Sequence, residues 1–414
     1  MKQIDTTPTR ETTTSTEPIG WETLEEFIRL QVEAQVQCLL EAEATEHLGR
    51  ARYRRRTGAS KRGYRNGLGK PRRLSLSCGT IVVRRPRLRD LEERFESRLL
   101  PRFARQSKQL KATLPVLYLE GLALRDFDRA LRGLLGDGAP LSASTIERLK
   151  EHWTRQFAAW REERIEEEIV YVWADGIYVK AGLEKDKAAV LVVIGVSVDG
   201  VKRVLAVEPG YRESTDSWKE VFQSLVRRGM NVPKAVIADG GLGLWAAIRD
   251  LGWPSKEQRC WNHKICNVQD ALPKREQKRA LTLLRAIPQS ETLEEAVRSR
   301  DVFLEEFAAY PKACERLLND WERLVSYYEL PKEHWRGLRT SNVVESPFQV
   351  VRLRTGAARR YKKVENATAV IWKLLLIAES NFKLFDAAQL LRDVANGHQF
   401  ANGQPKSDSR SLVA

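Results

Sequence analysis

The stretches IVYVWADGIYVK (residues 169–180) and KAVIADGG (residues 234–241) decide the fold of this chain. In each one, a run of apolar residues gives way to an aspartate followed by glycine, at Asp175 and at Asp239. Short runs rich in Val, Ile and Tyr, bounded by glycine, are typical of buried strands. We therefore predict that each aspartate is carried by a strand of one sheet.

The segments between these stretches indicate the order of elements. AAVLVVIGVSVDG (188–200) and VKRVLAVEPG (201–210) predict two more strands, which form an antiparallel meander with the first. Residues 214–229 predict a helix, capped at Ser214 to Asp216 and stopped by Gly229, and residues 242–252 a second helix. Three strands, a helix, a strand and a helix make a ribonuclease H-like order, in which Asp175 and Asp239 lie on neighbouring strands. The predicted fold class is α/β with a mixed sheet.

A third carboxylate, Glu345, lies in TSNVVESPFQVVRLR (340–354), 106 positions after Asp239. Residues 264–335 between them are helical in pattern and rich in charge and aromatic rings, which predicts an all-helical insertion. Two carboxylates on strands and one on a helix suit a site for two Mg²⁺ ions, with Mn²⁺ as a substitute. We expect Asp175 to bridge the ions, while Asp239 and Glu345 each hold one. Nearby acidic competitors are Asp186, Asp199, Glu208, Glu213 and Asp216.

The helix around Glu345 has two possible starts. Ser341 and Asn342 could cap it, which would place Arg352 two turns from Glu345 on the same face, in position to hold a substrate phosphate. Alternatively Ser346 caps the helix and Pro347 is its first residue. In that case Glu345 lies just outside the helix.

The charge of the chain indicates a polyanionic partner. It has 70 Lys and Arg against 55 Asp and Glu, a net charge of +15, and residues 50–89 hold fifteen Lys or Arg and no acidic residue. Such a segment neutralises several phosphates of a nucleic acid. The predicted DNA-binding residues are Arg54, Arg55, Arg56, Lys61, Arg62, Arg65, Asn66, Lys70, Arg72, Arg73, Arg352 and Arg354.

The N-terminal third is predicted to be mainly helical. Residues 21–48 read as an amphipathic helix, and SLSCGTIVVRRPRLRD (75–90) as a hairpin closed at Cys78–Gly79. Residues 109–160 predict two helices and a third that begins with a capping box at Ser144–Glu147. This order resembles a helix-turn-helix that reads the major groove, and the alternative is a packed helical linker.

The cysteines and histidines allow one further site. Five scattered cysteines favour a reducing, cytoplasmic compartment, and no apolar run approaches the ~18 residues of a membrane span. Cys260, His263 and Cys266 could hold zinc with Cys314 or His334, but the fourth ligand is not evident. The favoured interpretation is a hydrogen-bonded element beside the active site, with Lys264 and Lys274 as phosphate contacts.

Taken in order, a set of short motifs resembles the mutator-type transposases of bacterial insertion sequences, which belong to the DDE superfamily. The matching pieces are Arg65-Asn66-Gly67, LYLEGLALRDF, ADGIYVK, SWKEVFQSLVRRG, IADGGLGLWAAI, QRCWNHK and TSNVVES. The resemblance covers roughly residues 20 to 385. It implies a ribonuclease H-like core, Asp175, Asp239 and Glu345 as catalytic triad, Cys260 and His263 as the C-x-x-H motif, and Mg²⁺-dependent cutting and joining of DNA. Where the family usually continues Leu-Asn after Glu345-Ser346, this chain has Pro347-Phe348.

The expected function is therefore a transposase that binds the terminal inverted repeats of its mobile element as double-stranded DNA, in the bacterial nucleoid. A homodimer or larger assembly is expected, since two ends must meet, with the first helix as an interface. The alternatives are an endonuclease or resolvase of the same fold without strand transfer, and a DNA-binding protein whose catalytic site has decayed. The predicted organisation is a tail (1–18), a basic DNA-binding region (19–100), a helix-turn-helix-like region (101–164), a catalytic domain (165–263 and 336–395), the insertion (264–335) and a flexible tail (396–414).

Overall fold

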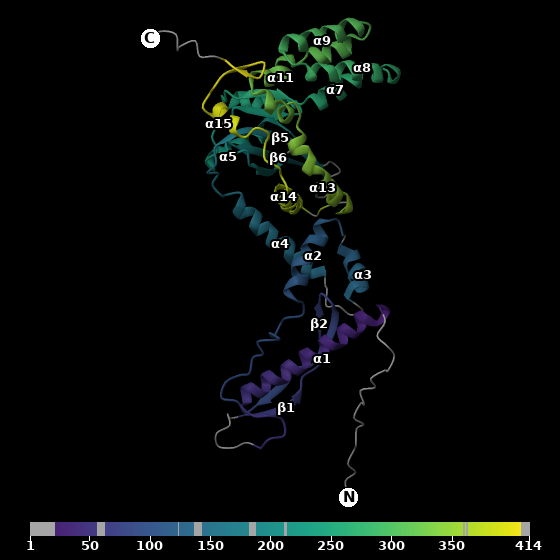
Figure 1. The fold of residues 1–414 in the computed structure, drawn as a ribbon, viewed down its shortest axis with the longest axis vertical. Coiled ribbons are helices and arrows are strands. Elements are labelled where there is room, and N and C mark those ends of the chain that lie inside the picture. The colour runs from purple at the N-terminus through teal and green to yellow at the C-terminus, as the bar shows by residue number, and fades with distance from the viewer. Residues whose placement is uncertain are drawn as a thin grey trace, which may run out of the picture. The chain divides into compact units, whose positions relative to one another are not determined.

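The computed structural model describes residues 21–55, 63–122, 124–135, 143–181, 188–210, 213–358, 361 and 363–406 (Figure 1). The chain divides into two compact units, one formed by residues 1–118 and 124–145, the other by residues 119–123 and 146–414. The predicted tail at residues 1–18 lies outside the described residues.

The first unit is built on α1 (Trp21–Leu48), which has the predicted bounds. β1 (Tyr64–Leu68) pairs with β4 (Pro86–Arg89), and β2 (Arg72–Leu76) pairs with β3 (Gly79–Val83), both antiparallel. The turn between β2 and β3 lies where the hairpin was predicted, because Leu76 faces Gly79 across it.

Polar side chains of α1 complete the hydrogen bonding of β3 and the residue after it. Gln37 accepts from the backbone N–H of Arg84 at 2.8 Å and donates to its carbonyl at 2.9 Å, and Glu33 accepts from the N–H of Val82 at 2.9 Å. The helix thus occupies the position of a neighbouring strand, and its apolar side encloses a small core. The fully or nearly buried members of this core are Leu40, Leu74, Ile81, Val83 and Leu100.

Three helices follow, as the pattern predicts: α2 (Lys108–Leu119), α3 (Leu124–Leu135) and α4 (Ala143–Trp160). The side chains of the predicted capping box at Ser144–Glu147 lie outside the described part of the chain. The helix-turn-helix interpretation stays a prediction.

The second unit contains a five-stranded sheet with the order β7-β6-β5-β8-β9. β5 (Ile169–Val179), β6 (Ala188–Ser197) and β7 (Lys202–Gly210) form the predicted antiparallel meander. β8 (Ala235–Ala238) pairs parallel with β5, and β9 (Lys256–Arg259) parallel with β8. The sheet is therefore mixed, and the predicted α/β class is confirmed.

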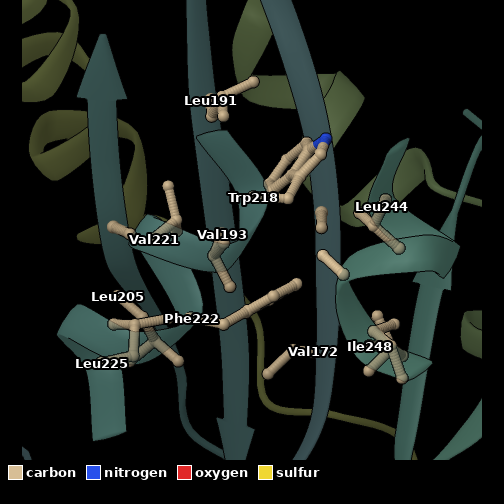
Figure 2. Packing of buried hydrophobic residues seen from close by; sticks show 14 of the residues in the cluster. Val172, Leu191, Val193, Leu205, Trp218, Val221, Phe222, Leu225, Leu244 and Ile248 are labelled. Carbon is tan, nitrogen blue, oxygen red and sulfur yellow. The ribbon is translucent and has the colours of Figure 1, made fainter. Parts of the chain in front are cut away.

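One face of this sheet is covered by α5 (Thr215–Arg227) and α6 (Leu242–Asp250). Figure 2 shows Trp218 and Phe222 of α5 packing between strand residues such as Val193 and helix residues of α6 such as Ile248. As predicted, Ser214 caps α5, since its Oγ accepts from the N–H of Ser217 at 3.3 Å.

The opposite face carries α12 (Trp335–Leu338), α13 (Asn342–Ala358), α14 (Val364–Glu379) and α15 (Gln389–Ala395). Aromatic residues of β5 fix this layer. Trp173 Nε1 donates to the carbonyl of Gly337 at 3.1 Å, and the rings of Tyr171 and Trp173 both contact Phe385.

The predicted all-helical character of residues 264–335 is confirmed (Figure 1, green). The segment begins inside α7 and ends at the start of α12, with an aromatic core around Phe303, Phe307, Tyr327 and Tyr328. Its elements are α7 (Trp261–Gln269), α8 (Lys274–Ala286), η1 (Ile287–Gln289), α9 (Leu293–Glu306), α10 (Pro311–Leu318), α11 (Trp321–Val325), η2 (Ser326–Glu329) and η3 (Lys332–His334).

The expectation of a loose tail from residue 396 is wrong for its first part. β10 (Phe400–Ala401) and β11 (Gln404–Pro405) form a small hairpin, with Phe400 only 3% exposed. The N–H of Gly403 donates to the carbonyl of Tyr328 at 3.1 Å, and the N–H of Lys332 to the carbonyl of Gly403 at 3.2 Å. The buried ring of Phe400 and these backbone hydrogen bonds hold the segment in place despite its polar composition. Within the described residues, no helix is long and apolar enough to cross a membrane.

Candidate active site

The two aspartates lie side by side on neighbouring strands, Asp175 within β5, which continues to Val179, and Asp239 directly after the end of β8. Ala174 of β5 pairs with Ala238 of β8 in parallel register, so the next residues are Asp175 and Asp239. The predicted adjacency of their strands is confirmed. The parallel pairing produces it, since it brings the end of β8 beside Asp175 of β5.

Asp175 is a nearly buried acid, 9% exposed. Burial above all, together with the charges of Asp239, Glu213 and Glu345, raises its pKa to about 7, against a hydrogen bond that Oδ1 accepts from the N–H of Gly176 at 2.8 Å. Three other carboxylates are thus close enough to act on Asp175. The edge of the sheet is a concentrated acidic cluster.

The loop that carries Asp239 is held from both sides. Its Oδ1 accepts from the N–H of Gly241 at 2.9 Å, and its carbonyl accepts from Nε of Arg259 at 3.2 Å. Gly240 has a φ of +102°, and a Cβ there would lie 2.3 Å from Arg259 Nε. Glycine is therefore required for the guanidinium to lie against this turn.

Glu345 lies in the first turn of α13, which begins at Asn342. The N–H groups of Val344 and Glu345 both donate to the carbonyl of Ser341 at 3.0 Å, so the helix starts as the first alternative predicted. The second alternative, a start at Pro347, is wrong. Proline has no N–H, so Pro347 leaves the carbonyl of Val343 without its usual helical partner, yet the helix continues to Ala358.

Ser341 connects Glu345 to the sheet. Its hydroxyl donates to Glu345 Oε1, and its backbone N–H donates to Cys260 Sγ at 3.3 Å. Cys260 in turn donates its N–H to the carbonyl of Ala238 at 2.7 Å, beside Asp239. A second bond, from the N–H of Trp261 to the carbonyl of Arg339 at 2.9 Å, runs parallel to the first. The two ends of the insertion therefore meet at the acidic edge.

His263 lies one turn along α7 from Cys260 and faces Glu345, with Nδ1 3.6 Å from Oε1. Contact with Cys260, with smaller contributions from the charges of Glu345 and Asp239, raises the pKa of His263 to about 9 against the effect of burial. Burial alone would raise the pKa of Cys260, but hydrogen bonds with His263 and Ser341 outweigh it and lower the pKa. The interpretation of the C-x-x-H motif as a hydrogen-bonded element fits these contacts.

Among the described residues, one group of three potential metal ligands has all its ligand atoms within 4.8 Å: Cys260, His263 and Glu345. The carboxylates of Asp175, Asp239 and Glu345 do not form so tight a group here, because Glu345 is turned toward Ser341 and His263.

The partners considered for a zinc site with Cys260 are engaged elsewhere. Cys266 is exposed. His334 hydrogen-bonds with the Tyr171 hydroxyl at 3.0 Å and the carbonyl of Ala387 at 3.2 Å, and Cys314 donates to the carbonyl of Phe307 at 3.3 Å. Among the described residues, neither His334 nor Cys314 belongs to the close group of ligand atoms around Cys260.

Glu213 also lies at this site, although from the sequence it was only one of several acids that competed with the three proposed metal ligands. Its pKa is raised by burial and by the charge of Asp239, while the Tyr178 hydroxyl and His263 lower it. Of the other competitors, Asp199 pairs with Arg392 at 3.3 Å, Glu208 pairs with Arg161 at 2.6 Å, Asp216 lies in the first turn of α5, and Asp186 lies outside the described residues. No local signal marks Glu213, because the glycines that surround it, at 176, 241 and 243, come together only in the fold.

The predicted DNA-binding residues of the first unit fall into three sets. Arg54, Arg55, Lys70 and Arg73 are exposed, and Arg56, Lys61 and Arg62 lie outside the described residues.

Arg65, Arg72 and Asn66 make contacts within the protein. Arg65 donates to Thr45 Oγ1 at 2.7 Å, and Arg72 donates to the carbonyl of Ala104 at 2.5 Å. The side chain of Asn66 is oriented so that its oxygen accepts from Arg89 Nε at 2.7 Å. These three residues therefore support the fold of the unit as well as its charge.

A cavity of about 340 Å³ lies along β4 and the loop after it. Its lining includes Arg85, Arg87, Arg89 and Arg94, none of which was singled out from the sequence. Burial and the charges of Arg105 and Arg85 lower the pKa of nearby Arg72, which reflects how closely these cations are crowded.

Two cations predicted to contact phosphate are buried instead. Arg354 is 2% exposed, whereas Arg352 on the same helix is exposed. Lys264 is also 2% exposed, and its Nζ donates to the carbonyls of Arg316 at 2.7 Å and Asn319 at 2.5 Å, at the end of α10. Both positions face the protein interior, so neither side chain is available to DNA. Lys274 is exposed.

The chain is similar to known proteins over most of its length. The family model described as "Transposase, Mutator family" matches residues 5–384. The transposase for insertion sequence element IS6120 of Mycolicibacterium smegmatis is 39% identical over 297 residues, which are 71% of this chain and 92% of that protein. The transposase for element IST2 of Acidithiobacillus ferrooxidans is 34% identical over 280 residues (67% and 95%), and that for ISRM5 of Rhizobium meliloti is 29% identical over 359 residues (86% and 88%). The resemblance inferred from the motifs is confirmed.

Proposed function

Because the chain belongs to the Mutator family of transposases, we propose that it cuts DNA at the ends of its own mobile element and joins those ends to a target. The observation that carries this proposal is the acidic edge of the sheet. There Asp175 of β5 lies beside Asp239 at the end of the paired strand β8, and the charge of Glu345 acts on Asp175 from α13. We assign the core to the ribonuclease H-like class, since its strands run in the order third, second, first, fourth, fifth.

The acidic edge fits divalent cations. Its donors at Asp175, Asp239 and Glu345 are hard carboxylate oxygens, which Mg²⁺ prefers, with Mn²⁺ as a substitute. The mutual repulsion that raises the pKa of Asp175 is the repulsion that a bound cation removes. When bound, a pair of such ions supplies positive charge at the attacking and leaving oxygens of a phosphodiester. For Glu345 to join Asp175 and Asp239, its side chain has to turn from Ser341 and His263.

In the proposed cleavage, water attacks phosphorus, the bond to the 3′ oxygen breaks, and the products are a 3′-hydroxyl and a 5′-phosphate. In joining, that 3′-hydroxyl attacks a target phosphodiester and displaces another 3′ oxygen. The chain's own groups position these reactants. His263, cationic at neutral pH, lies against Glu345, and Arg352 extends into solvent on the helix that carries Glu345.

The first unit and the helices that follow, residues 19–164, are proposed to bind the terminal inverted repeats. The exposed cations Arg54, Arg55, Lys70 and Arg73 and the arginine-lined cavity along β4 give it a surface for phosphates. Such contacts position a protein on the duplex without reading its sequence.

Two element ends have to be brought together, so we propose a dimer or a larger assembly. The exposed apolar side chains Trp21, Phe27, Ile28 and Leu30 of α1 make this helix the proposed interface. Trp21→Glu together with Leu30→Glu should shift the mass measured by light scattering toward the monomer. An unchanged mass would assign the contact to another surface.

The decisive experiment supplies purified protein and Mg²⁺ with a duplex taken from the DNA that borders its gene, together with a target plasmid. A transposase gives 3′-cut ends and joined products. A nuclease of the same fold gives cut ends alone, even when pre-cut ends are supplied. Asp239→Asn should abolish both activities while leaving DNA binding intact. If Asp239→Asn cleaves as fast as the wild-type protein, the proposed chemistry is wrong.

A further inference from the structure

Three side chains of different chemistry converge beside the acidic edge. Sγ of Cys260, a ring nitrogen of His263 and a carboxylate oxygen of Glu345 all lie within 4.8 Å of one another. Nδ1 of His263 is 3.6 Å from Oε1 of Glu345. Around a tetrahedral zinc ion, neighbouring ligand atoms are about 3.5 Å apart. The group is therefore close to the size that one bound metal ion requires.

Two of the three side chains come from one end of a helix. Cys260 is the N-cap residue of α7, and His263 follows three positions later, so both lie on the same side of its first turn. Cys260 is fully buried, and its sulfur accepts from the N–H of Ser341 at 3.3 Å. A helix N-terminus favours the thiolate, which is the form that binds metals. The sulfur is thus held in place as a ligand.

The imidazole of His263 has a nitrogen without a well-directed partner. Although the ring contacts Cys260, no described atom meets its buried Nδ1 at the distance and angle of a hydrogen bond. The 3.6 Å separation from Glu345 Oε1 is also too long for one. A buried polar atom in this situation indicates a missing partner, and an ion is one kind of partner that completes it.

The donor set selects zinc rather than magnesium. Thiolate and imidazole are ligands that Zn²⁺ prefers, whereas Mg²⁺ takes oxygen donors in octahedral geometry. Three protein ligands leave the fourth tetrahedral position of zinc to a water molecule. When the ion binds, the thiol and the imidazole release their protons to solvent.

Glu345 links this group to the acidic edge. Its carboxylate accepts from the Ser341 hydroxyl and faces His263, and it has to turn away from both to join Asp175 and Asp239. An ion held by Cys260 and His263 would bind the carboxylate in its present orientation. The same side chain is therefore required in two positions.

We propose that Cys260, His263 and Glu345 form a binding site for Zn²⁺, and that the bound ion restrains DNA cleavage by keeping Glu345 away from Asp175 and Asp239. The restraint rests on the proposed cleavage at the acidic edge. The zinc site itself does not depend on that function.

The site is tested with Co²⁺ and the full chain, without DNA. Co²⁺ substitutes for Zn²⁺ in tetrahedral sites, and its bond to a thiolate absorbs in the near ultraviolet. Metal-free protein should develop this absorption as Co²⁺ is added, and Zn²⁺ should remove it. Cys260→Ser should abolish it, whereas Cys266→Ser, which alters an exposed thiol on the same helix, should not.

His263→Ala provides a second variant, because this side chain is 40% exposed and its loss is less disruptive to folding. Substituting a group that only hydrogen-bonds a metal ligand costs about 10–100-fold in affinity, so loss of a ligand should weaken Co²⁺ binding at least about tenfold. Equal melting temperatures without metal exclude misfolding as the cause. If the absorption survives Cys260→Ser, or is lost in Cys266→Ser, the site is overturned.

The restraint is tested by single-turnover cleavage of a duplex from the DNA bordering the gene, in excess Mg²⁺. Zn²⁺ at about ten times its dissociation constant leaves about one molecule in eleven without zinc, so cleavage should slow about tenfold. Half of the effect should occur at the Zn²⁺ concentration that displaces half of the Co²⁺. In His263→Ala the ratio of the rates with and without Zn²⁺ should return toward one. Inhibition as strong in this variant as in the wild-type protein would place the inhibiting ion elsewhere.

The possible failures are distinguishable. If Zn²⁺ binds at Cys260 and cleavage is not slowed, the restraint is overturned and the site stands. If the Co²⁺ absorption does not depend on Cys260 while Asp239→Asn abolishes cleavage, the site is overturned and the proposed function stands. If Asp239→Asn cleaves like the wild-type protein, the proposed function and the restraint fall, and the Co²⁺ titration alone decides the site.

Discussion

The backbone N–H of Ser341 donates a hydrogen bond to Sγ of Cys260 over 3.3 Å, although 81 positions separate the two residues. The hydroxyl of the same serine holds Glu345. Ser341 is fully buried, so both bonds are shielded from water. The position of the third carboxylate thus depends on a contact made across the whole helical insertion.

Ser341→Ala removes the hydroxyl and keeps the N–H. A hydrogen bond to a charged group contributes about 1.5–3 kcal/mol, and Glu345 has to break this one to join Asp175 and Asp239, so we expect single-turnover cleavage at limiting Mg²⁺ to rise roughly tenfold with DNA affinity unchanged. Ser346→Ala is the matched control, because Ser346 is exposed and follows Glu345 directly. Equal cleavage rates for the two variants would show that the hydroxyl does not position Glu345.

The stability of the metal-free protein should depend on the ionisation of Asp175. Its pKa is raised to about 7 in the folded protein, so between pH 4 and 7 the folded state binds more protons than the unfolded state, and the free energy of unfolding falls as pH rises. Asp175→Asn removes this loss. In EDTA at pH 8 it should be more stable than the wild-type protein by about 2 kcal/mol or more, and at pH 4 the difference should vanish.

The control for this prediction is Asp199→Asn, which alters an exposed ion pair with Arg392. Urea unfolding of each variant at both pH values gives the comparison. A stabilisation by Asp175→Asn that is the same at pH 4 and pH 8 would mean that the ionisation of the buried Asp175 carboxyl is not its origin.

Substitutions of two neighbouring arginines on β2 should have different effects, one on DNA binding and the other on stability. Arg73 is exposed, whereas Arg72 donates to the carbonyl of Ala104. Arg73→Gln should weaken DNA binding and reduce the slope of log K against log salt by about 0.9, with no change in melting temperature. Arg72→Gln should lower the melting temperature of the protein. If both variants alter only the melting temperature, β2 does not contact the phosphates.

Alanine substitution of two helical glycines should change the free energy of unfolding in opposite directions. A Cβ added to Gly356 of α13 would meet no atom within 4 Å beyond its own helix backbone. Gly356→Ala should therefore raise the free energy of unfolding by about 0.5–1 kcal/mol. Gly243→Ala of α6 would bring its Cβ to 2.3 Å from the Glu213 carbonyl oxygen and should be destabilising. Equal effects of the two substitutions would contradict the tight packing described for Glu213.

The sequence predicted those helices and strands that are specified by short runs of neighbouring residues. Runs of β-branched residues marked β5, β6 and β8, and the order of elements sufficed to pair Asp175 with Asp239. The start of the Glu345 helix was left between two alternatives, because Ser341 and Ser346 are equally good caps in isolation.

What the sequence could not supply depends on contacts between distant segments. Whether an arginine on a helix is exposed or buried depends on how the helix packs. The sequence alone therefore does not distinguish exposed Arg352 from buried Arg354. Glu213 was indistinguishable from other surface acids, since the glycines that enclose it come from β5 and from the turn into α6. The hairpin at residues 400–405 has a mostly polar sequence, and it is held mainly by hydrogen bonds between its backbone and that of the helical insertion.

The junction of Cys260 with Ser341 makes the helical insertion a loop that is closed at its base. That closure is reinforced from within the insertion, because Asp320 pairs with Arg259, whose Nε donates to the carbonyl of Asp239. A short linker in place of the whole insertion should therefore disturb the turn at Asp239 as well as the position of Glu345.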